Sequence, residues 1–188
     1  MWPKIRLNAR KSTSVLVGSI GSDLTALAEA DFYAYSNYYP KCTRGVFADV
    51  PKFLEMTAKR FQIVHLVCRI ADSGVIIDEQ GPNLPCSKLL DETYRHGAQL
   101  LFIAGENPKE AYINGVKLAG RNMNIIMTLD RRGDVFATFL SNLTGSIAAG
   151  EPMVEAWAKL APQIPGASNR DLPACIFAAG LPKAVFLP

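Results

Sequence analysis

Short apolar runs alternate with segments of helical periodicity along most of this chain. Residues 14–18 (SVLVG), 63–67 (IVHLV), 100–104 (LLFIA) and 123–127 (MNIIM) have the length and composition of strands that are buried on both faces of a sheet. Segments of helical character separate these runs, as in consecutive βαβ units. The sequence therefore predicts an α/β sandwich with a mainly parallel central sheet.

Several of the intervening segments carry the start signals of helices. Asp49 followed by Pro51 predicts an amphipathic helix that directs Phe53, Leu54 and Met56 inward. Further helices are expected at residues 87–96, from 107 to about 120, around 136–143, and after 152.

The remaining elements are predicted from caps, aromatic content and short apolar runs. Asp23 can cap a short helix over residues 23–30, and the aromatic segment 32–39 (FYAYSNYY) predicts a second strand because aromatic residues favour strands. Residues 75–77 suit a short edge strand, and residues 174–179 suit a closing strand.

Length and composition indicate one globular domain. The chain has 188 residues, of which 49% are hydrophobic, enough for a continuous core. We expect a single domain over residues 1–188, with residues 1–12 as an irregular N-terminal lead-in. Charged residues or glycine interrupt every apolar stretch before it could cross a bilayer, and no secretion segment is evident. The expectation is a soluble cytoplasmic protein with no membrane contact.

The charge distribution and the metal-binding residue types argue against two further classes, nucleic-acid-binding and metal-binding proteins. The net charge is +3, but the basic residues are spread along the chain, which disfavours a nucleic-acid partner. The four cysteines show no CxxC spacing, and there are only two histidines. We therefore expect no metal site and no cofactor.

Four segments together resemble the CHAT domain, a bacterial branch of the caspase and separase group of cysteine proteases. They are IVHLVCRI (63–70), LLFIAGENP (100–108), GEPMVEAW (150–157) and LPACIFAAG (172–180). The first two are similar to the strands that end in the family's catalytic histidine and cysteine. The resemblance covers nearly the whole chain and implies a caspase-like three-layer α/β/α sandwich.

The departures from the family fall on the catalytic residues. In the family, the histidine ending the first motif is the general base and the cysteine of the second is the nucleophile. The matching positions here are Arg69 and Glu106, the second within one residue. Arginine cannot accept a proton at neutral pH. The resemblance therefore implies an inactive enzyme, in which Arg69 and Glu106 could pair as a salt bridge.

Other side chains are expected to line the crevice at the strand ends, where α/β proteins gather their ligands. Asn107 also has the type and position of a helix N-cap before Pro108. His65 matches the family's first, non-catalytic histidine, and a hydrogen-bonded core histidine is the competing interpretation. The full set of possible crevice residues is His65, Asn107, Asp130, Arg131, Arg132 and Asp134.

The remaining cysteine and histidine pairs are poor catalytic partners. His65 and Cys68 are an odd number of positions apart on one strand, so their side chains point to opposite faces. Cys86 and His96 flank one predicted helix and would lie roughly 15 Å apart along its axis. Neither pair could replace the missing dyad.

The leading hypothesis is a catalytically inactive pseudo-protease that acts as a protein-interaction module or regulatory subunit. The resemblance implies a protein partner in a bacterial defence or stress assembly and leaves the oligomeric state open. One alternative is a hydrolase with a displaced dyad, or one using Glu106 with Asp130 or Asp134. Another is a nucleotide- or signal-binding domain in which Arg69, Arg131 and Arg132 contact phosphate.

Overall fold

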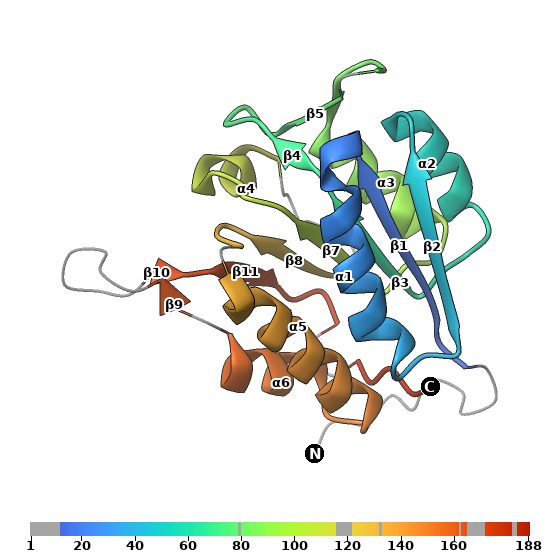
Figure 1. Cartoon of the computed structure of the whole chain (residues 1–188), viewed down its shortest axis with the longest axis vertical. Helices are drawn as coiled ribbons and strands as arrows, with labels where there is room; N and C mark the ends of the chain where they lie inside the picture. Colours follow the sequence, from blue (N-terminus) through green and yellow to red (C-terminus); the bar gives the residue numbers. More distant parts are fainter. Residues whose placement is uncertain are drawn as a thin grey trace.

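The computed structural model describes residues 12–78, 80–115, 122–131, 133–161, 163–164, 172–181 and 184–188. It shows a three-layer α/β/α sandwich around a six-stranded sheet (Figure 1). The predicted α/β class with a mainly parallel sheet is confirmed. The expected N-terminal lead-in lies almost wholly outside the described residues.

The central sheet has the order β11-β8-β7-β3-β1-β2. Only β11 runs antiparallel, against β8, and the other five strands are parallel. The predicted run at 100–104 is a strand with the expected bounds, whereas the strand that begins at residue 63 ends at Val67, before its expected end at Arg69. The six strands are β1 (Ser14–Ile20), β2 (Lys41–Phe47), β3 (Ile63–Val67), β7 (Leu100–Ala104), β8 (Asn124–Thr128) and β11 (Cys175–Ala178).

Helices cover both faces of the sheet because alternate strand residues point to opposite sides (Figure 1). Val15, Ile63 and Phe102 pack with one group of helices, whereas Leu16 and Leu101 pack with the other. The first group is α1 (Thr25–Ser36), α5 (Gly133–Ala148) and α6 (Met153–Leu160). The second is α2 (Val50–Thr57), α3 (Cys86–Arg95) and α4 (Lys109–Gly115).

The strand predicted at residues 32–39 is wrong, because α1 continues through most of this segment. Tyr35 and Tyr39 are four positions apart, and both are buried, with ring centroids 6.5 Å apart. Tyr33 and Tyr38 remain exposed. Packing of one helical face against the sheet has overridden the strand preference of aromatic residues. The second strand instead follows the aromatic segment.

Helix starts were predicted with mixed success. The Asp49 carboxylate caps α2 by accepting a hydrogen bond from the Lys52 amide at 2.8 Å, as expected. Asp23, expected as another cap, lies inside the 3-10 helix η1 (Ser22–Leu24), and neither η1 nor α1 has a side-chain cap. The helix expected from residue 107 begins at Lys109, and its expected end near Gly120 lies outside the described residues.

Two small sheets flank the central one. The first, order β4-β5-β6, follows β3 and includes the predicted edge strand at 75–77. The small strands are β4 (Arg69–Ile70), β5 (Val75–Ile77), β6 (Leu84–Pro85), β9 (Gln163–Ile164) and β10 (Leu172–Pro173).

Among the described residues, no helix is both long and apolar enough to cross a membrane.

Candidate functional site

The carboxyl ends of β1, β3, β7 and β8 lie along one edge of the sheet, where parallel α/β folds present their ligand groups. Arg69 follows β3 there and forms an ion pair with Asp23 of η1. A hydrogen bond from this guanidinium lowers the pKa of the Asp23 carboxyl. Glu106 is exposed after β7. The Asp23 partner of Arg69 was not predicted, and a pairing of Arg69 with Glu106 stays a prediction.

Asn107 is 3% exposed and uses its amide to connect two strand ends. Its Oδ1 accepts a hydrogen bond from the Ile70 amide at 3.1 Å, and its Nδ2 donates to the Thr128 carbonyl at 3.1 Å. A carboxamide suits this place because it supplies one acceptor and one donor in the same plane. The side chain expected to line the crevice therefore bonds to the domain's own backbone.

Gly105 brings the end of β7 against its two neighbours. A Cβ atom at this position would lie 2.3 Å from the Cys68 carbonyl oxygen, so no side chain fits without a backbone shift. The Gly105 amide donates to Thr128 Oγ1 at 2.8 Å, and Thr128 Oγ1 donates back to the Gly105 carbonyl at 2.5 Å. Gly105 directly precedes position 106, and a cysteine side chain at position 105 would not fit for steric reasons.

His65 is completely buried in the middle of β3 and faces α1. Its ring stacks on Phe102, with centroids 4.7 Å apart and planes at 26°. The hydrogen bonds fit one neutral tautomer, in which Nε2 donates to Asp31 Oδ2 at 2.8 Å and Nδ1 accepts from the Tyr35 hydroxyl at 3.1 Å. Burial lowers the pKa of His65. His65 therefore belongs to the core and does not line an open crevice.

Arg131 completes this buried network from the connection between β8 and α5. Its two terminal nitrogens donate to the two carboxylate oxygens of Asp31 at 2.6 and 2.8 Å. The guanidinium lies over the Phe136 ring, 4.2 Å from its centroid, and the side chain is 6% exposed. Burial would raise the pKa of the Asp31 carboxyl, but His65 and Arg131 hold it below its usual value.

The network shows what sequence reasoning missed. Asp31 was not singled out, because Glu29 stands two positions before it in the same segment and nothing local distinguishes the buried acid from the more exposed one. Arg131 was expected in the crevice as a possible phosphate contact, whereas its charge is already paired in the core. Its burial leaves the nucleotide-binding alternative without one of its three arginines.

The structure describes the other predicted crevice residues only in part. Asp130 is half-buried, and its amide donates to the Ala174 carbonyl at 3.2 Å. Arg132 lies outside the described residues, and Asp134 stands in the first turn of α5, with its side chain outside the described part.

His65 and Cys68 do not form an alternative dyad. His65 and Cys68 belong to opposite faces of the sheet, as predicted. Burial raises the pKa of Cys42 to about 12 and that of Cys175 to about 11, and it raises the pKa of Cys68 as well. A thiol with a raised pKa is a poor nucleophile at neutral pH because the thiolate is the reactive form.

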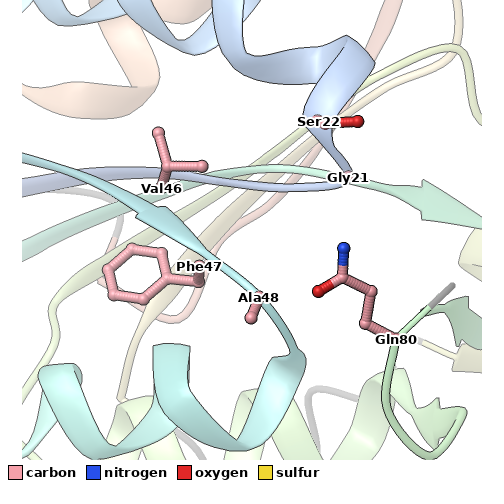
Figure 2. A pocket seen from close by; sticks show the side chains of 6 residues that line it. All are labelled: Gly21, Ser22, Val46, Phe47, Ala48 and Gln80. Atoms are coloured by element: carbon pink, nitrogen blue, oxygen red, sulfur yellow. The ribbon is translucent and has the colours of Figure 1, made fainter.

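A pocket of about 290 Å³ lies at the carboxyl ends of β1 and β2. Figure 2 shows the Gln80 amide reaching toward the turn at Gly21, with Val46 and Phe47 on the β2 side. Arg69 and Glu106 are not among the lining residues, so this hollow is distinct from the presumed catalytic positions. The lining residues are Gly21, Ser22, Val46, Phe47, Ala48 and Gln80.

Neither metal chemistry nor sequence comparison assigns a function. The described part of the chain contains no group of three or more histidine, cysteine, aspartate or glutamate side chains placed to hold a metal ion. No protein-family model matches the chain, and no curated protein sequence matches it. The resemblance to the CHAT domain therefore depends on the motifs alone.

Replacing Asn107 with leucine should lower the free energy of unfolding by about 2 kcal/mol, because the buried Ile70 amide loses its acceptor. Asn114→Leu is the matched control: its amide donates to the Asp72 carbonyl at 2.7 Å but is exposed, so the change should stay within about 0.5 kcal/mol. Urea unfolding measures both. Equal effects of the two substitutions would show that Asn107 does not hold the strand ends together.

Arg131→Met should destabilise the domain by about 3–5 kcal/mol, because it leaves the Asp31 carboxylate buried without its cation. Adding Asp31→Asn to Arg131→Met should recover part of this loss by removing the uncompensated charge. A double-mutant cycle measured by chemical denaturation gives the coupling energy. Additivity of the two substitutions within about 0.5 kcal/mol would contradict a coupled pair.

The stability of the domain should fall as the pH drops below about 6.5, because the unfolded chain then binds a proton at His65 that the folded chain binds less readily. Asp31 affects stability at lower pH. Because its pKa in the folded chain is below the ordinary value of 3.8, its contribution to stability is lost only as the pH falls below 3.8. His65→Phe should therefore flatten the pH dependence between about pH 7.5 and about pH 5.5. Urea unfolding across this range tests it, and an unchanged slope in the variant would refute the assignment.

Proposed function

We propose that this chain is a catalytically inactive, caspase-like domain of the CHAT type that acts as a protein-interaction or regulatory module. The proposal includes a protein partner in a bacterial defence or stress assembly and a cytoplasmic location, as the resemblance implies. The observation that supports it most is the internal bonding at the strand ends. Arg69 at the presumed base position is held by Asp23, and Asn107 beside the presumed nucleophile position is held by two backbone groups.

The environments of both histidines support the same proposal. His65 has both ring nitrogens engaged inside the core. His96 ends α3, and its Nδ1 donates to the Thr57 hydroxyl at 2.8 Å, since that hydroxyl itself donates to the Leu54 carbonyl at 2.6 Å. A general base needs a free ring nitrogen within reach of the nucleophile. His65 has no free ring nitrogen, and His96 lies just before the amino end of β7, at the opposite edge of the sheet from position 106.

A cysteine-reactive activity probe and a peptide-library cleavage assay test the absence of peptidase activity. We expect no cleavage, and no labelling of the folded chain beyond slow alkylation, because burial raises the pKa of three of the four thiols. Single Cys→Ser variants at the four positions are the controls. Proteolysis that disappears in one of them would sink the proposal.

The alignment beneath this proposal has its own test. If positions 69 and 106 correspond to the family's base and nucleophile, Glu106→Cys combined with Arg69→His should bring an imidazole beside the new thiol and lower the pKa of that thiol. Alkylation by iodoacetamide near neutral pH should then be several-fold faster than in Glu106→Cys alone. Equal rates would mean that the two positions do not face each other, and the resemblance would lose its main argument.

A further inference from the structure

β2 is one of the two edge strands of the central sheet, and β11 is the other. All seven residues of β2 pair with β1, and among the described residues no strand pairs with its other side. Figure 1 shows β2 at the margin of the sheet, beside α1. Such an edge presents backbone N–H and C=O groups that an extended segment can pair with.

The amino-terminal half of this edge is cationic. Lys41 and Arg44 are both exposed on β2. The Arg44 guanidinium forms an ion pair with Glu29 of α1 and lies 5.9 Å from the centroid of the Phe32 ring, so it is held close to the strand. Two cations against one anion leave this half with an excess of positive charge.

The carboxyl-terminal half is apolar and continues into the pocket of about 290 Å³. Val46 is 58% exposed although it is a β-branched apolar residue in a regular strand. The Phe47 ring forms the adjoining wall, where it packs edge-to-face on Phe53 with centroids 5.2 Å apart. Figure 2 shows both side chains beside the hollow into which Gln80 reaches.

We propose that the β2 edge and the pocket at its carboxyl end form a docking site for an extended segment of another protein. The segment adds a strand to β2, carries acidic residues opposite Lys41 and Arg44, and places a large apolar side chain at the pocket beside Val46. This assignment rests on the proposed interaction function and names its surface and the chemistry of its partner.

The charge on β2 argues for a foreign segment and against a second copy of this chain. A twofold antiparallel pairing of β2 with itself over its whole length would place Arg44, the central residue of the strand, directly opposite its own copy. Like charges at directly opposed positions destabilise a strand pair. The same cations attract an acidic segment, so the edge discriminates between the two occupants.

The test uses the full chain and a displayed library of random peptides. We expect the selected peptides to combine acidic residues with an aromatic or large aliphatic residue near one end. Val46→Asp and Lys41→Glu should each weaken their binding at least tenfold. Val135→Asp is the matched control, because Val135 is 60% exposed but lies on α5, and it should leave binding unchanged. Hydrogen exchange should show new protection of β2 amides in the complex.

Three results would overturn the docking site. They are selection of no peptide, binding that Val46→Asp leaves intact, and a concentration-dependent dimer that Val46→Asp abolishes, which would identify a second copy as the occupant.

The failure of the proposed function can be distinguished from the failure of the docking site. Peptides that bind through β2 and are then cleaved would refute the inactive assignment and leave the docking site standing, whereas a chain that neither cleaves nor selects peptides refutes the docking site alone.

Discussion

The buried ion pair between Arg131 and Asp31 constrains much of the rest of the fold. It joins α1 to the connection after β8, and His65 adds the central strand β3 to the same network. Removing a charge from water costs several kcal/mol, so such a pair is tolerated only when its geometry and its further hydrogen bonds are good. The rotation of α1 about its axis and the path of the β8–α5 connection are therefore coupled to each other.

This coupling has a consequence for chemistry. A catalytic centre keeps its polar side chains available for a substrate, whereas here Asn107 and Arg131 near the strand ends, and His65 in the middle of β3, all bond to other parts of the domain. Thr128 and Gly105 add reciprocal hydrogen bonds between β8 and the end of β7. These contacts stabilise the domain, and they agree with the proposed lack of catalysis at the strand ends.

The sequence predicted the sheet better than the site, and the reason is the range of the interactions involved. Leu100–Ala104 was predicted with its correct bounds, and Ile63–Val67 with its correct start, because a short apolar run is a local signal. The aromatic segment was predicted as a strand from its local composition. The burial of Tyr35 and Tyr39 depends on residues distant in the sequence, which local composition does not reveal. Asp31 and Arg131 are 100 positions apart, so only the tertiary structure reveals that each is the other's partner.

The two edges of the sheet differ in a way that bears on recognition. One edge strand, β11, makes four antiparallel pairs with β8, whereas the other, β2, is ordered by seven consecutive parallel pairs with β1. A preformed strand loses little conformational freedom when a segment pairs with it, so most of the ordering cost of binding falls on the partner. The proposed recognition of an extended chain at this edge therefore depends on the backbone groups of β2 and on a few exposed side chains.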